Sequence, residues 1–222
     1  MKVLGIDTSC AAASACVVDA EDAGFLALAA ERAEDNRAEA LAPMIQRIVA
    51  QTGGMAGLER IAVTVGPGSF TGIRIGIALA RAMGLALKIP VVGVSTLHAF
   101  AAPFFSSSPG GPIAAVVDAR HGAAYFELFD SYGASRGPAR AMKYVEIVRA
   151  IGSGPARIAG DAAELLAAEA KRYGLAVEGV ASSGSPDAFE VAKIGARLDP
   201  AGAPARPLYV KAPDVRAPAP AA

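Results

Sequence analysis

Short hydrophobic runs that end in polar turns recur along both halves of the chain, a pattern typical of buried β-strands. The first three runs are separated only by short polar segments, which predicts an antiparallel meander. Seven runs are predicted as strands: residues 3–6, 13–18, 25–30, 61–65, 91–94, 113–117 and 123–129.

Between residues 37 and 52 the hydrophobic spacing changes to that of an amphipathic helix. One face carries Leu41, Met44, Ile45, Ile48 and Val49, and the segment stops at Thr52-Gly53-Gly54. Further helices are predicted over residues 72–87, 96–102, 144–150, 161–173 and 187–198. Alternating strands and helices predict an α/β protein with mixed sheets.

A cluster of Pro, Ser and Gly over residues 103–112 predicts a boundary between two subdomains. We expect subdomains at residues 1–108 and 109–210, followed by a Pro- and Ala-rich tail at residues 211–222. In each half an apolar strand ends at an aspartate, Asp7 or Asp118, before a second strand begins. This echo predicts an internal duplication of the fold, with two similar halves that meet at a cleft.

Composition narrows the classes of function. Lys+Arg 21 balance Asp+Glu 21, and neither half has the basic excess of a protein that binds a nucleic acid backbone unaided. Cys10 and Cys16 have no partner cluster, which predicts a reduced, cytoplasmic setting. His98 and His121 are too far apart to form a helical metal-binding pair, so no metal site is predicted. Arg81 interrupts the most apolar stretch, so no membrane segment or signal peptide is expected.

The first candidate site is Asp7-Thr8-Ser9, at the end of the first predicted strand. A carboxylate and two hydroxyls at a strand end suit a hydrated magnesium ion beside a nucleotide phosphate. The same residue types also form turns that only satisfy backbone donors. Both interpretations stay open at this stage.

The second candidate is the glycine loop of residues 66–74, between a predicted strand and a predicted helix. Its chemistry-bearing residues are Gly66, Gly68, Ser69, Thr71, Gly72 and Arg74. Glycines allow backbone amides to approach an anion at a helix N-terminus. The loop lacks the Lys-Ser/Thr of one familiar phosphate motif, however, and its glycine spacing is one longer than the dinucleotide fingerprint. The alternative is a tight turn with a Ser or Thr cap and Phe70 in the core.

The third candidate is Asp118 with Arg120, at the matching strand end of the second half. Asp118 is expected to face the cleft opposite Asp7, although Arg120 is bulky where a phosphate loop favours glycine. An ATPase or small-molecule kinase with Asp7, Gly68 and Asp118 around Mg-ATP therefore stays an alternative. No Ser-His-Asp or Cys-His combination is predicted.

Small residues form a stripe along the helix predicted at residues 72–87: Gly72, Gly76, Ala80 and Gly84. Glycine inside a helix costs about 1 kcal/mol relative to alanine, so the stripe calls for close packing. The partner surface is either the helix of residues 41–49 or a helix of another molecule.

Taken together, these motifs resemble the TsaB (YeaZ) family. The similarity rests on residues 5–9, 37–43, 66–76, 90–97, 118–125 and 207–211. It implies an actin/hexokinase/Hsp70-like (ASKHA) fold with two related subdomains, each a mixed sheet of the five-stranded type flanked by helices.

The resemblance also implies a non-catalytic role in tRNA threonylcarbamoyladenosine (t6A) modification. TsaB-like proteins pair with TsaD, which carries the metal and the catalysis, and with the ATPase TsaE. No cofactor is then expected on this chain, and tRNA is met mainly through the complex. The implied TsaD contact, also open to a homodimer, comprises Leu41, Met44, Ile45, Ile48, Gly72, Gly76, Ala80 and Gly84.

One feature departs from the pattern of the family that the chain resembles. Many relatives have a His at the start of the first helix, where this chain has Arg37. The older glycoprotease-like peptidase label finds no support, because the closely spaced histidine pair of the sister family is missing.

Overall fold

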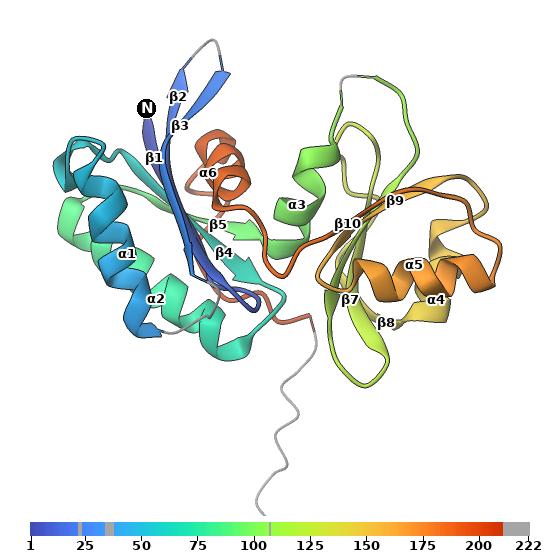
Figure 1. Ribbon diagram of the computed structural model, residues 1–222. Helices are drawn as coiled ribbons and strands as arrows, with labels where there is room; N and C mark the ends of the chain where they lie inside the picture. The colour runs from blue at the N-terminus through green and yellow to red at the C-terminus, as the bar shows by residue number, and fades with distance from the viewer. Residues whose placement is uncertain (22–23, 34–37, 107, 211–222) are drawn as a thin grey trace, which may run out of the picture.

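The computed structural model describes residues 1–21, 24–33, 38–106 and 108–210, and in these ranges it contains two mixed five-stranded sheets (Figure 1). The first sheet has the order β3-β2-β1-β4-β5, and the second β10-β9-β6-β7-β8. The strands of the first sheet are β1 (Lys2–Asp7), β2 (Ala13–Glu21), β3 (Gly24–Ala33), β4 (Arg60–Gly66) and β5 (Val91–Ser95). Those of the second are β6 (Ile113–Asp118), β7 (Ala123–Phe129), β8 (Arg140–Lys143), β9 (Ala156–Gly160) and β10 (Val177–Ser182).

The two sheets repeat one topology. Strand β1 is antiparallel to β2 and parallel to β4, and β6 is antiparallel to β7 and parallel to β9 in the same way. Asp7 and Asp118 therefore end corresponding strands. The duplication and the mixed sheets predicted from the sequence are confirmed.

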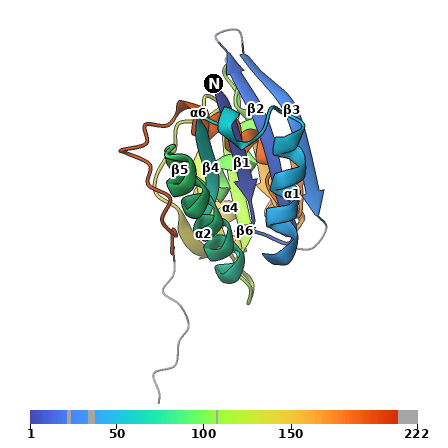
Figure 2. The same ribbon diagram turned by 90° about the vertical axis from the view of Figure 1, so that its left-hand side faces the viewer.

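Helices α1 (Ala38–Ala50) and α2 (Phe70–Leu87) lie side by side on one face of the first sheet (Figure 2). Helix α1 packs on β2 and β3, α2 packs on β4 and β1, and their apolar sides share a single core. Helices α4 (Tyr144–Ile151) and α5 (Ala163–Arg172) cover one face of the second sheet around a separate core. Short 3₁₀ turns lie at Met55–Gly57 and Ala102–Phe104.

The third helix of each half crosses to the other sheet. Helix α3 (Thr96–Ala101) packs Leu97 and Phe100 with β6 of the second sheet. Helix α6 (Ala188–Arg197) falls inside the range 109–210 predicted for the second subdomain, yet it packs on β1, β2 and β4 of the first sheet. The Nη1 of Arg60 donates to three carbonyls at the C-terminal end of α6, each at 2.9 Å. These crossings tie the halves together.

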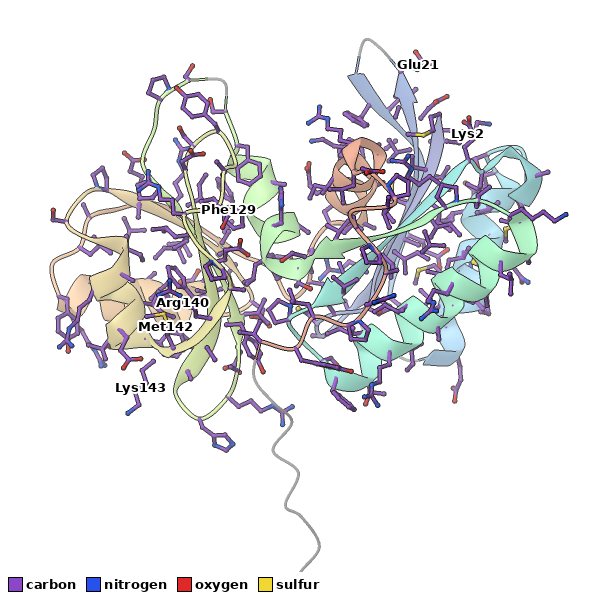
Figure 3. All side chains as sticks on the ribbon, turned by 180° about the vertical axis from the view of Figure 1, so that it is seen from behind. Lys2, Glu21, Phe129, Arg140, Met142 and Lys143 are labelled. Atoms are coloured by element: carbon purple, nitrogen blue, oxygen red, sulfur yellow. The ribbon has the colours of Figure 1, made fainter. Side chains whose placement is uncertain are left out.

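Three strands, β8, β9 and β10, were not predicted. They are short, and each contains Ala together with Lys, Gly or Glu, residues with weak strand preference. Their backbone groups pair with adjacent strands of the sheet. These residues therefore form strands because of that pairing, and not because of their intrinsic propensity. On the edge strand β8, Arg140 and Lys143 are exposed, while Met142 is half-buried against the second core (Figure 3).

Among the described residues, α2 alone is long and apolar enough to cross a membrane, with a mean hydropathy of 1.4 over 18 residues. Arg81 therefore does not shorten the apolar stretch as predicted. A core helix passes the same test, and α2 buries Ile73, Ile77 and Ala80 within the core of the first sheet.

Candidate functional site

A cleft of about 620 Å³ opens between the two sheets, where the ends of β1 and β6 approach each other. It is lined by Ser9, Cys10, Ala11, Gly68, Ser69, Phe70, Thr71, Val117, Asp118, Ala119, Arg120, Tyr125 and Asp161. The structure thus brings together six of the predicted site residues: Ser9, Gly68, Ser69, Thr71, Asp118 and Arg120. The other five, Asp7, Thr8, Gly66, Gly72 and Arg74, do not line the cleft.

Asp7 lies completely buried behind the cleft wall. Its Oδ1 accepts hydrogen bonds from the Ser9 amide at 3.0 Å, the Ser9 hydroxyl at 2.6 Å and the Thr64 hydroxyl at 2.8 Å. Its Oδ2 has no hydrogen-bond partner among the described residues. Burial raises the pKa of Asp7 to about 6, against the opposing effect of these hydrogen bonds and of the Arg32 charge. Asp7 therefore organises the turn that follows β1.

That turn is joined directly to the glycine loop. The Ser69 amide donates to the Ser9 carbonyl at 2.6 Å, and the Thr8 hydroxyl donates to the Gly72 carbonyl at 2.8 Å. At Gly68, with φ of +156°, a Cβ would lie 2.1 Å from the Ser9 carbonyl oxygen. Glycine is required there because the two loops touch backbone to backbone. The groups predicted to cradle a phosphate are thus largely bonded to each other.

The first turn of α2 fastens the C-terminal segment. Ser69 caps the helix by accepting from the Gly72 amide at 3.2 Å. Phe70 is 44% exposed rather than in the core, and its ring stacks on Tyr209 at 5.6 Å. The Arg74 guanidinium lies 3.7 Å above the Phe70 ring, and its Nε donates to the Tyr209 hydroxyl at 2.9 Å. Arg74 therefore holds residues near 209 against the helix. Gly66 makes a related contact, since a Cβ there would lie 3.0 Å from the Leu208 carbonyl oxygen.

The second half contributes mainly acidic groups to the cleft. The Oδ1 of Asp161 accepts from the Asp118 amide at 2.8 Å, and Asp118 Oδ1 accepts from the Arg120 amide at 2.8 Å. Arg120 and His121 adopt left-handed backbone angles, φ of 62° and 54°, in the turn between β6 and β7. Burial raises the pKa of Asp161, and the charge of Asp118 raises it further. Two carboxyl groups and one guanidinium thus line the cleft.

Cys10 and Asp161 are cleft residues that sequence reasoning missed. Burial raises the pKa of the Cys10 thiol, with further contributions from the charges of Asp7 and Asp161. Asp161 directly follows β9, a strand that was not predicted, and recognition of that strand would have placed Asp161 at a sheet end. In the described ranges, no three His, Cys, Asp or Glu side chains gather as a metal site would require.

The residues predicted to form a partner interface are buried inside this chain. Leu41, Met44, Ile45 and Ile48 are each 1% exposed and belong to the core of the first sheet. The small-residue stripe Gly72, Gly76, Ala80 and Gly84 is buried as well. A Cβ on Gly76 would lie 2.2 Å from Thr8 Oγ1, and one on Gly84 would lie 2.2 Å from Val91. At Gly76 and Gly84 the stripe therefore packs on its own sheet. Arg37 lies outside the described residues.

The repeated sheet topology, the crossed helices and the cleft between strand ends define an actin/hexokinase/Hsp70-like protein. The chain belongs to the family described as TsaD, tRNA N6-adenosine threonylcarbamoyltransferase, whose model matches residues 28–193. Within that family its resemblance to TsaB proteins is confirmed. It is 34% identical to the tRNA threonylcarbamoyladenosine biosynthesis protein TsaB of Escherichia coli over 127 residues, 57% of this chain and 54% of that protein.

Two further comparisons extend over nearly the whole chain. An uncharacterized protein of Mycobacterium tuberculosis is 33% identical over 215 residues, 96% of this chain and 93% of that protein. The structure of YeaZ from Pseudomonas aeruginosa superposes with a TM-score of 0.71 at 22% identity, covering 94% of this chain and 99% of that one. The latter supports the fold. By contrast, the chain spans about half the length of the TsaB relatives that it matches first.

Proposed function

We propose that this chain is a non-catalytic subunit of the system that makes t6A in tRNA, in which it binds a TsaD protein and activates or stabilises it. The names of the family model and of the TsaB relatives support this role. TsaD would transfer the threonylcarbamoyl group to the adenosine next to the anticodon. ATP and metal would reside on TsaD and TsaE, and tRNA would be met mainly through the cytoplasmic complex.

The observation that carries this proposal is the hydrogen bonding of the two cleft loops to each other. The Ser69 amide is bonded to the Ser9 carbonyl, and Asp7 Oδ1 is bonded to Ser9 and Thr64. A phosphate would have to replace these bonds. In the cleft it would also meet the two carboxyl groups of Asp118 and Asp161, against the single guanidinium of Arg120. These features favour a scaffold over a nucleotide-processing site.

Calorimetric titration of the isolated chain with Mg-ATP distinguishes the kinase alternative from the proposed non-catalytic role. We expect no tight binding. Tight binding that Asp7→Ala abolishes would favour a stand-alone ATPase or kinase. The residues of the cleft do not support the peptidase alternative. Peptide cleavage by this chain that is lost when a chelator is added would support it.

The surface left for TsaD on α1 and α2 is rich in small side chains. The buried faces of both helices cover the sheet, and the exposed positions include Ala42, Ala50, Ala78, Ala82 and Ala86. Alanine on an exposed helix face allows the backbone of another helix to approach closely. We propose these outward faces, in place of the buried stripe, as the contact with TsaD. A homodimer would use the same faces.

Reconstitution tests the role directly. Purified TsaD from the same organism, with tRNA and the other components, should form t6A several times faster when this chain is present. Transfer by this chain without TsaD would overturn the proposal. So would full TsaD activity in its absence.

The contact surface is tested by Ala78→Glu. Ala78 is exposed on α2, so we expect a change in unfolding free energy within about 0.5 kcal/mol. A charge pressed into a helix–helix contact should weaken TsaD binding by about tenfold or more, as measured by calorimetry. Ala168→Glu, at an exposed position on α5 of the second half, is the matched control and should bind normally. Equal affinities for the two variants would place the interface elsewhere.

A further inference from the structure

A groove of about 860 Å³ lies beside the C-terminal half of α2 and the start of β5. The C-terminal half of α2 forms one wall, and residues 200–206 of the returning chain form the other. Leu85, Ile89, Pro90, Pro200 and Pro204 make the surface of the groove apolar. Leu85 is 83% exposed, the largest exposed fraction among the large hydrophobic side chains described. The groove is therefore an apolar surface that the described chain leaves open.

Three cations surround this groove: Arg81, Lys88 and Arg206. All three are exposed, and none forms an ion pair or side-chain hydrogen bond with a residue that the structure describes. No Asp or Glu lines the groove. Residues 60–117 contain no acidic residue at all, although the whole chain has no net charge. Positive charge is thus concentrated beside apolar surface.

Helix geometry explains this concentration. Arg74 and Arg81 are seven residues apart, so they lie along one flank of α2 about two turns from each other, and Lys88 caps the C-terminal end of the helix. The opposite flank packs Ile75, Leu79 and Met83 against the core that α1 shares. The cationic flank therefore adjoins the outward alanine-rich surface proposed for TsaD, and Ala82 belongs to both.

We propose that this groove binds an acidic, amphipathic segment of a partner protein. Apolar side chains of that segment would cover Leu85 and the prolines, and its carboxylates would pair with Arg81, Lys88 and Arg206. A nucleic acid backbone complements the charge, but it would leave the apolar wall uncovered, and no aromatic ring lines the groove to stack a base. Residues 211–222 of the chain carry Lys211 and Arg216 against Asp214, so their charge is not complementary.

The test uses the full-length chain and three labelled probes in fluorescence anisotropy. The first is a short peptide of Glu and Leu in helical spacing, the second has Lys in place of Glu, and the third is an oligouridine of similar length. The acidic peptide should bind best, with an affinity that falls as salt increases. Arg81→Glu with Lys88→Glu should weaken it about tenfold or more and should improve binding of the basic peptide. Leu85→Ser should weaken it without a change of charge.

The matched control is Arg149→Glu with Lys171→Glu, which reverses two exposed cations on the second half and gives the same net charge. It should bind the acidic peptide like the wild type. Failure of the acidic peptide to bind, an equal loss in the control, or preferential binding of oligouridine would overturn the proposal. These outcomes do not depend on TsaD, so they are distinguishable from a failure of the proposed function.

Discussion

Asp7 is the clearest example of a single residue that lowers the stability of the folded protein. It is fully buried at the end of β1, and one of its carboxylate oxygens has no partner among the described residues. Ser14, directly opposite Asp7 in the β1–β2 pair, also buries a hydroxyl without a described partner. Removal from water disfavours the charged carboxylate, which raises its pKa to about 6. The free energy of unfolding should therefore depend on pH over the range in which Asp7 titrates.

We expect the contribution of Asp7 to stability to decrease as pH rises from about 4 to about 6. In this window the folded state binds more protons than the unfolded chain, whose Asp titrates near 3.8, so the free energy of unfolding falls with increasing pH. The shift corresponds to a loss on the order of 3 kcal/mol. Asp7→Asn removes this titration. In urea unfolding, the free energy of unfolding of the variant should increase relative to that of the wild type between about pH 4.5 and about pH 7.5.

Glu164→Gln controls for loss of a carboxylate, because Glu164 is exposed on α5. Its pH profile should match that of the wild type. Parallel profiles for the wild type and Asp7→Asn would contradict the buried titration of Asp7.

At the scale of elements, the glycine stripe of α2 is explained by the sheet beneath it. Thr8 at the end of β1 reaches under the helix to donate to the Gly72 carbonyl, and Gly76 leaves space for its side chain. Gly84 leaves space for Val91 of β5 in the same way. The stripe thus sets how closely α2 approaches the sheet and where the glycine loop meets the Ser9 turn.

Gly76→Ala is expected to destabilise the protein, although alanine favours a helix by about 1 kcal/mol. The new Cβ would lie 2.2 Å from Thr8 Oγ1, so the helix or the Thr8 side chain must shift. A net loss of about 1 to 2 kcal/mol is expected from overpacking, measurable by urea unfolding. Gly154→Ala, at a position with no neighbour within 4 Å, should be close to neutral. A stable Gly76→Ala protein would show that the helix has room here.

On the scale of the whole molecule, the crossed helices make the two halves interdependent. Helix α6 comes from the end of the chain, yet it covers Val3, Cys16, Val18, Ala62 and Val92 of the first sheet. Helix α3 likewise passes from the first half to the core of the second. Neither sheet is therefore covered on both faces by the half of the sequence that forms it.

A fragment of residues 1–108 should not fold cooperatively, because the face of its sheet that α6 covers would be exposed. We expect aggregation or a broad thermal transition by circular dichroism. Joining residues 186–210 to the fragment through a flexible linker should restore a sharp transition, since α6 can then return to β1. A sharp transition in the fragment alone would contradict this dependence.

The duplicated halves were predictable because hydrophobic runs and their terminal aspartates repeat in the sequence. The first-half strands, α1 and α2 follow from period and turn residues in the same way. Strands β8 to β10 did not follow, because pairing with neighbours outweighs their weak propensities. Asp161 was missed together with β9. In the cleft, Ser9, Gly68 and Asp118 were predictable as strand-end and loop residues.

The order of residues was sufficient to establish the fold class, the family and the positions of the cleft loops, because periodicity and local motifs encode them along the chain. Packing determined the rest. The stripe and the apolar face of α1 were expected to meet a partner. Instead they are buried against the chain's own sheet, which lowers the free energy of the folded protein. The neutral composition likewise conceals a cationic groove, since charge adds over the sequence but acts where side chains lie together.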